Sequence, residues 1–178
     1  MRAAVLEATG ALLSHRGYDD MTVAAIAERS GAGKQSLYRI WGSKAGLAAE
    51  AVLHGTFSLK VEPVPNTGHI RQDLTAWLTG VARYVGQPRI ASVVRALAAA
   101  SAGDGTRAGA FDEVLTSPVR RVLIDRLEAA RHAENLVVAG PLPIMADLII
   151  GYLALSAVGT APMDERSVAD LVSVLLQS

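Results

Sequence analysis

The sequence predicts an all-α protein. Apolar residues recur with the 3.6-residue period of a helix through most of the 178-residue chain, and no segment shows the convincing apolar–polar alternation of a strand. No proline occurs before Pro63, and Pro63 and Pro65 then arrive together with other turn-forming residues, a composition that marks a linker or turn. We therefore expect one helical domain over residues 1–54 and a second helical domain over residues 55–178.

Residues 22–44 have the pattern of two short helices joined by a glycine turn. Thr22 is a suitable N-cap, because its hydroxyl oxygen can accept from a backbone N–H two or three residues on, and Gly31 suits the left-handed backbone that ends a helix. The second helix begins at Lys34. The apolar residues form one stripe in each helix, and they are Val23, Ile26, Ala27, Leu37, Ile40 and Trp41. A helix, a tight glycine turn and a second helix make a helix-turn-helix.

The same segment is basic. From Arg29 to Lys44 it holds Arg29, Lys34, Arg39 and Lys44 and no carboxylate, so it carries a charge of +4 in a chain whose net charge is zero. A local basic cluster is the electrostatic pattern expected at phosphates. An ordinary helical hairpin with a basic exposed face would show the same charge and periodicity, so these two features alone leave both interpretations open.

A series of residues in register decides between them. A glycine–tyrosine pair closes the first helix, an Ile–Ala pair lies in the second, a Leu–Tyr pair lies in the third, and an aromatic residue, Ser, Lys and Leu open the fourth. These residues are Gly17, Tyr18, Ile26, Ala27, Leu37, Tyr38, Trp41, Ser43, Lys44 and Leu47. The order resembles the DNA-binding domain of TetR-family transcriptional regulators. The resemblance implies a three-helix DNA-binding domain with a helix-turn-helix, a connecting fourth helix, and a C-terminal helical domain for effector binding and dimerisation.

Two glycines depart from what the resemblance or a regular helix would favour. Gly33 stands where the family usually has serine or threonine, so a side-chain cap is missing at the start of the recognition helix. Gly10 interrupts the first helix, which costs about 1 kcal/mol relative to alanine at an exposed site. Alternatively, Gly10 allows another part of the chain to pack closely against this helix.

The resemblance also implies which residues contact DNA. The expected base-edge readers are Gln35, Ser36 and Arg39, since Gln suits adenine and Arg suits guanine in the major groove. The expected phosphate contacts are Thr22, Lys34, Tyr38 and Lys44, which orient the protein without reading sequence. For Tyr38 the alternative is a place in the core.

Beyond the linker the helical pattern continues. A helix carrying Leu74 to Val85 ends before Pro88, because the residue preceding a proline is pushed out of the α region. Further helical stretches are expected over residues 89–102, from Phe111 and again from Pro118 toward His132, over Pro143–Gly159, and around Val168–Leu175.

The last two of these helices predict a homodimer. The helix over Pro143–Gly159 is apolar nearly all round, so it must be covered on both sides. One of its faces carries Met145, Leu148, Ile149 and Tyr152. We expect a symmetric four-helix bundle between two copies, which the resemblance also implies. The alternative is that both helices complete a monomeric core. The expected interface residues are Ile144, Gly151, Leu155, Val158, Val168, Leu171, Val172 and Leu175.

The resemblance further implies a small-molecule effector bound within the C-terminal helices. The candidate lining residues are His54, Trp77, Tyr84, Phe111, Met145, Ile149 and Tyr152. Each of these side chains also fits an ordinary core position. Because few polar groups are available among them, we expect an apolar or aromatic effector.

Other classes of protein fit poorly. The absence of cysteine excludes disulfides and thiolate metal sites and suits a reducing cytoplasm. The most apolar stretch, Leu142–Val158, contains Asp147, so a buried helix is a better interpretation than a membrane span. Gly31 to Lys34 matches only half of a phosphate-binding loop, and the four histidines lack metal-ligand spacing. We expect neither an enzyme nor a bound metal or cofactor.

These observations together predict a cytoplasmic, dimeric, sequence-specific DNA-binding regulator. The expected mode is a repressor released from a palindromic operator by the effector, with half-sites ~34 Å apart or somewhat more. The alternative is a helical protein-binding co-regulator or adaptor without DNA binding. The expected partners are double-stranded DNA, a small molecule and a second copy of the chain, but not a membrane.

Overall fold

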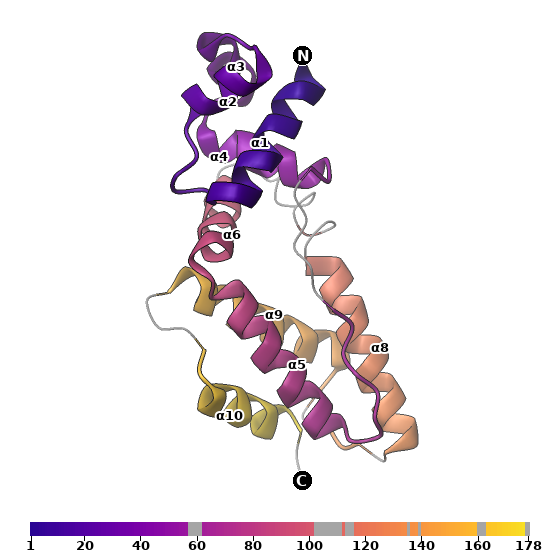
Figure 1. Ribbon diagram of the computed structural model, residues 1–178. Helices are drawn as coiled ribbons and strands as arrows, with labels where there is room; N and C mark the ends of the chain where they lie inside the picture. Colours follow the sequence, from indigo (N-terminus) through magenta and orange to yellow (C-terminus); the bar gives the residue numbers. More distant parts are fainter. Residues whose placement is uncertain are drawn as a thin grey trace. The chain divides into compact units, whose positions relative to one another are not determined.

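The computed structural model is all-α over the residues that it describes, which are 1–56, 62–101, 112, 116–134, 136–138, 140–159 and 163–176. In this part of the chain the helices are α1 (Arg2–Arg16), α2 (Val23–Ser30), α3 (Lys34–Trp41), α4 (Lys44–Leu53), α5 (Ile70–Val85), α6 (Pro88–Ser101), α8 (Ser117–Ala133), α9 (Leu142–Val158) and α10 (Glu165–Leu175) (Figure 1). Strand-like pairing in these residues is limited to one isolated antiparallel bridge between Val138 and Leu176. The predicted fold class is confirmed, and the predicted apolar face at Phe111 lies outside the described residues.

The chain divides into two compact units. The first unit comprises Met1–Leu59 and Pro88–Val114, and the second comprises Lys60–Gln87 and Leu115–Ser178. Helix α6 therefore packs with the N-terminal helices, although the chain reaches it only after α5. The functional division at residue 54 remains a prediction.

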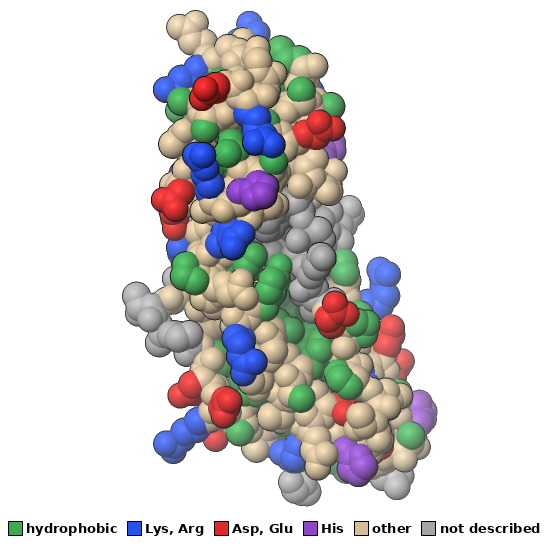
Figure 2. Space-filling view, viewed as in Figure 1, with side chains coloured by type: hydrophobic (Ala, Val, Ile, Leu, Met, Phe, Trp, Pro, Cys, Tyr) green, Lys and Arg blue, Asp and Glu red, His purple; other side chains and the backbone are tan. Residues whose placement is uncertain are grey.

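In the first unit, α1 packs against α2, α4 and α6, and α4 also packs against α6. The largest fully buried side chains include Leu13, Ile26, Leu37, Trp41 and Leu47, so each of the first four helices buries part of its apolar stripe. Charged side chains of both signs are interspersed over the face of the protein that Figure 2 shows.

Gly10 lies at the closest approach within this unit. A Cβ added to Gly10 would lie 2.3 Å from the carbonyl oxygen of Thr56, which follows α4. No side chain larger than hydrogen fits there unless the backbone of Thr56 moves. Of the two interpretations of Gly10, the structure confirms close packing.

In the second unit, α5 packs against α8, α9 and α10, and α8 packs against α9. Its core includes Leu74, Leu78, Leu123, Leu127 and Ile149, all of which are 1 % exposed or less. Helix α5 ends at Val85, before Pro88, and α8 has a proline in its first turn, as the sequence predicted.

The segment that the sequence marks as a linker or turn is fixed to the second unit by buried polar groups. The Arg126 guanidinium donates to the carbonyl of Pro65 at 2.8 Å, to Asp73 at 2.7 Å and to Glu134 at 2.8 Å. Thr67 donates to Asp73 from its backbone N–H at 3.0 Å and from its hydroxyl at 2.6 Å. Burial alone would raise the pKa of Asp73, but the hydrogen bonds from Arg126 and Thr67 outweigh it and lower that pKa to about 2.

Candidate DNA-binding site

Helices α2 and α3 form the predicted helix-turn-helix. The Thr22 hydroxyl oxygen accepts from the backbone N–H of Ala25 at 3.1 Å, which caps the start of α2. Gly31 ends α2 in the left-handed conformation, with φ of 68°. Gly33 precedes α3 in an extended conformation and provides no side-chain cap. The cap, the turn glycine and the missing cap at α3 are all confirmed.

Helix α3 has one buried edge and one broad exposed face. Leu37 and Trp41 lie four residues apart and are buried, whereas Ile40 is 42 % exposed. The prediction that Ile40 belongs to the apolar stripe is therefore wrong. At 100° per residue, Ile40 lies about 80° from the centre of the stripe that Leu37 and Trp41 define, so this short helix turns it outward.

The predicted base readers and two of the predicted phosphate contacts share the exposed face of α3. Lys34, Gln35 and Arg39 are exposed, and Ser36 is partly exposed. Tyr38 is 48 % exposed, so its ring is not a core residue in this structure.

The cations around α3 are not neutralised by neighbouring carboxylates. Among the described residues, no ion pair involves Arg29, Lys34 or Arg39. These three positive charges are exposed near the turn and on α3, where they can meet the phosphates of a duplex.

Lys44 has a different environment. Its ammonium donates to the carbonyl of Tyr18 at 2.9 Å and to that of Asp19 at 3.4 Å, and it lies 4.2 Å from the centre of the Tyr18 ring. Burial raises the pKa of the Tyr18 hydroxyl, and Asp19 raises it further. Lys44 therefore joins the start of α4 to the turn between α1 and α2. Its predicted contact with a phosphate stays a prediction, and a third N–H remains for such a contact.

Helix α6 holds the same turn from another direction. The Ser92 hydroxyl oxygen accepts from the backbone N–H of Tyr18 at 2.9 Å, and Arg95 pairs with Asp19 at 3.2 Å. Arg89 donates to the carbonyl of Ser14.

Gly17 lies where α6 closely approaches the end of α1. Its φ is 77°, and an added Cβ would lie 2.8 Å from Cγ of Arg89. Sequence reasoning missed these residues of α6. The only signal was the spacing of Arg89, Ser92 and Arg95, three residues apart on an otherwise alanine-rich helix.

The effector pocket stays a prediction, and its described residues differ in burial. Trp77, Met145 and Ile149 are buried in the core of the second unit, Tyr84 is partly buried and Tyr152 is 40 % exposed.

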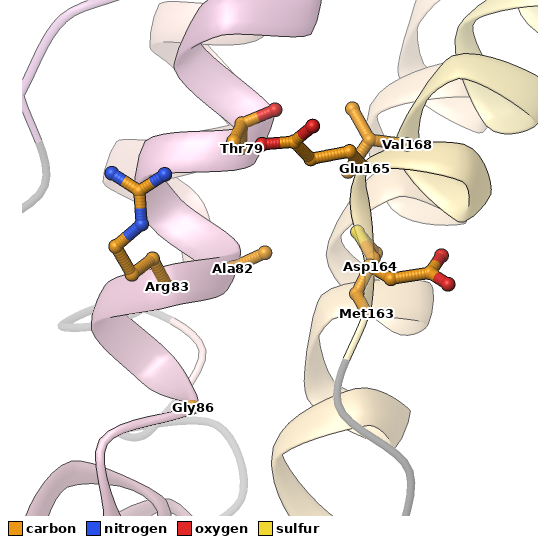
Figure 3. A pocket seen from close by; sticks show the side chains of 8 residues that line it. All are labelled: Thr79, Ala82, Arg83, Gly86, Met163, Asp164, Glu165 and Val168. Atoms are coloured by element: carbon orange, nitrogen blue, oxygen red, sulfur yellow. The ribbon is translucent and has the colours of Figure 1, made fainter.

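Of the other two, Phe111 lies outside the described residues. His54 belongs to the first unit, is exposed, and has its Nε2 atom 3.6 Å from Glu50. The second unit has a cavity between α5 and α10, shown in Figure 3, and none of the seven predicted residues lines it.

The predicted dimer residues divide into two groups. Ile144, Gly151 and Leu155 are exposed on α9, and Leu171 is partly exposed. By contrast, Val168, Val172 and Leu175 of α10 are 1–2 % exposed and pack in the core of the protomer itself. These three side chains are therefore not accessible to a second copy, because the apolar stripe of α10 packs against α5 of the same protomer. Val158 ends α9, and its side chain is outside the described part.

This geometry defines a class of protein: a helix-turn-helix protein whose second helix exposes hydrogen-bonding side chains and cations that, among the described residues, have no carboxylate partner. Residues 5–51 match the family described as "Bacterial regulatory proteins, tetR family", and residues 64–175 match the "Tetracyclin repressor-like, C-terminal domain". The chain belongs to the TetR family of transcriptional regulators. It is a DNA-binding regulator and not an enzyme.

Individual relatives agree with this assignment. The chain is 34% identical over 180 residues to an uncharacterized HTH-type transcriptional regulator of Mycobacterium bovis, covering 98% of this chain and 85% of that protein. It is 31% identical over 156 residues to the uncharacterized regulator YdeS of Bacillus subtilis, covering 83% and 73%. The crystal structure of the TetR family transcription regulator SCO0332 superposes with a TM-score of 0.68 at 27% identity, covering 97% of this chain and 94% of that chain.

Members of this family typically bind DNA as homodimers that respond to small molecules. In the described part of this chain, no helix combines the length and apolar character needed to cross a membrane.

Proposed function

We propose that the protein is a dimeric, cytoplasmic repressor that binds a palindromic operator and is released from it by a small apolar or aromatic effector. The observation that carries the DNA-binding part is the exposed face of α3, where cations that have no carboxylate partner in the described part of the chain flank hydrogen-bonding side chains. Repression would result from the location of the operator, because a protein bound at a promoter sterically excludes RNA polymerase from it.

Sequence is read by Gln35, Ser36 and Arg39. Gln can pair with the N6 and N7 atoms of adenine, and Arg with the O6 and N7 atoms of guanine, each worth about 1–3 kcal/mol of discrimination when bidentate. The placement of all three on the outward side of α3, with Leu37 and Trp41 buried behind them, supports this assignment.

Thr22, Lys34, Tyr38 and Lys44 contact phosphates and fix the orientation of α3. Thr22 caps the start of α2, Lys34 begins α3, and Tyr38 is 48 % exposed. Contacts of this kind strengthen binding to every sequence and make it depend on salt.

The exposed side of α9 supports dimerisation. Ile144, Leu148, Tyr152 and Leu155 are each 40–71 % exposed, and their spacing of three or four residues places them on one face of the helix. Gly151 lies on the same face and would allow a second helix to approach closely. Burying large apolar side chains of this kind contributes about 1.5–3 kcal/mol each. We assign the interface to this face of α9 together with Leu171 and the 70 % exposed Val174 of α10.

The test is fluorescence anisotropy with DNA from upstream of the protein's own gene, compared with scrambled DNA of the same length, over a salt series. Tighter binding to the native fragment that weakens steeply with salt is the expected result. Equal and weak binding to both fragments, followed by failure to select any sequence from random DNA, would instead favour a helical protein-binding adaptor.

A further inference from the structure

The cavity between α5 and α10 has a volume of about 350 Å³ and lies in the second unit, among residues that no sequence motif singled out (Figure 3). This is at the lower end of the range for small-molecule sites. Since an apolar cavity of about 150 Å³ holds benzene, a ligand on the order of ten non-hydrogen atoms would fit.

One charged group faces this space. The carboxylate of Glu165 reaches from the first turn of α10 toward α5 and Thr79 (Figure 3), and no hydrogen bond or ion pair occupies it within the described part of the chain. Asp164 also borders the cavity, but its carboxylate accepts from the backbone N–H of Ser167 at 2.8 Å and turns away from α5. Arg83 turns its guanidinium away from α10 in the same view.

Thr79 adds a second acceptor beside this carboxylate. The Thr79 hydroxyl donates its proton to the carbonyl of Thr75 at 2.8 Å, so its oxygen is left with lone pairs that can accept. The remaining wall is apolar and comes from Ala82, Met163 and Val168. A negative charge and a hydroxyl acceptor above an apolar wall are complementary to a group that is positively charged, donates N–H bonds and carries a hydrocarbon body.

We propose that this cavity binds a small amphipathic amine, whose ammonium group lies between Glu165 and Thr79 and whose apolar part packs on Ala82, Met163 and Val168. Binding itself is independent of the proposed function. Only its consequence, a change in operator affinity, rests on that function.

Glu165 also has an ordinary structural role, because a negative charge in the first turn of a helix interacts favourably with the helix dipole. The experiment must therefore measure ligand binding and fold stability separately.

Isothermal titration calorimetry of the full chain with three probes of similar size provides the test. The probes are 2-phenylethylamine, which is a cation at pH 7, 2-phenylethanol, which is neutral, and 3-phenylpropionate, which is an anion. We expect saturable binding of one amine per protomer, with the alcohol and the acid weaker by roughly tenfold or more, as for the loss of one charge-assisted hydrogen bond.

Two variants assign the site. Glu165→Gln should weaken amine binding by roughly tenfold. The matched control is Asp170→Asn, which removes an exposed acid from the same helix but does not border the cavity, and it should leave amine affinity unchanged. A third variant, Ala82→Leu, should fill the cavity and abolish binding, and the thermal midpoint of each variant reports whether it is folded.

The proposal is overturned if the amine does not saturate, if the three probes bind equally, or if Glu165→Gln keeps full amine affinity and changes only the thermal midpoint. Preferential binding of the acid would show that Arg83 governs the site and would equally overturn it. Anisotropy on the operator, with and without the amine, is a separate measurement. Failure to bind the operator without amine would contradict the proposed function while leaving the amine site standing.

Discussion

Arg39 and Lys34 are both exposed on α3, and neither has a carboxylate partner among the described residues. Their chemistry differs, because a guanidinium can form two parallel hydrogen bonds to one base whereas an ammonium acts as a point charge. The two residues therefore offer a way to separate base reading from backbone attraction.

Arg39→Ala should weaken operator binding by about 1–3 kcal/mol and weaken binding to scrambled DNA much less. Lys34→Ala should weaken binding to both DNAs alike and reduce the slope of log affinity against log salt by about 1. Anisotropy titrations of both variants on both DNAs give the comparison. Identical behaviour of the two variants would contradict the assignment of Arg39 as a base reader.

Gly10 and Gly80 are both glycines inside helices, but they differ in what surrounds them. A Cβ at Gly10 would meet the Thr56 carbonyl oxygen at 2.3 Å, whereas one at Gly80 of α5 would meet nothing within 4 Å. Gly10→Ala should lower the free energy of unfolding by about 1–3 kcal/mol through overpacking. Gly80→Ala should raise it by about 0.5–1 kcal/mol through helix propensity. Urea denaturation of both variants measures these changes, and a stable Gly10→Ala would show that the contact yields without cost.

At the scale of elements, the helix-turn-helix was the part most open to prediction. Its signals are local: Thr22 caps α2, Gly31 takes the left-handed conformation, and Leu37 with Trp41 fixes the buried edge of α3. The prediction that Ile40 belongs to the buried stripe was wrong because a helix of eight residues buries only a narrow stripe.

The partner of α6 could not be predicted in the same way. Its contacts with Ser14, Tyr18 and Asp19 join residues more than 70 positions apart. Helix periodicity says which residues share a face, but not which distant element covers that face.

Helix α9 shows a related limit. Its apolar residues surround the helix, so no face stands out in the sequence, and Met145 and Ile149 were grouped with Leu148 and Tyr152. In the structure the first pair is buried and the second pair is exposed. Only the packing of α5 and α8 against α9 decides which side is the core.

The buried network of Arg126, Asp73 and Glu134 makes a prediction about pH. The pKa of Asp73 is lowered to about 2 in the folded protein from an ordinary value of 3.8. The ionised carboxylate therefore stabilises the fold above pH 4. This contribution to stability is lost as the pH falls through about 2. The stability advantage of the natural protein over Asp73→Asn should therefore be constant from pH 7 to 5 and shrink below pH 4. Urea denaturation at several pH values gives this difference, with Asp170→Asn as the exposed control. A difference that is independent of pH would contradict the ionised state of Asp73.

At the scale of the whole molecule, the exposed apolar face of α9 makes the two-fold dimer the central expectation. A dimer places two copies of α3 at successive major grooves, and a monomer contacts only one half-site. Loss of the dimer should therefore remove most of the operator affinity even though α3 is unchanged.

Leu155→Glu places a charge on the 71 % exposed α9 residue and should give monomers in sedimentation velocity, together with loss of operator binding. The control is Val137→Glu, which charges a 63 % exposed residue outside the helices and should leave the dimer intact. If both variants remain dimeric, the interface lies elsewhere than on this face of α9.

The first unit is assembled from two separate stretches of chain, with α5 of the second unit made between them. During synthesis, which proceeds at about 5–20 residues per second, α1 to α4 emerge before the helix that holds their turn. The turn between α1 and α2 gains its contacts with Arg89, Ser92 and Arg95 only after α6 has been synthesised. Helix α5 gains its packing partners only after α8, α9 and α10 have been synthesised. The first unit is therefore complete only after α5 of the second unit has been made, so the DNA-binding domain cannot finish folding before part of the second unit has been synthesised.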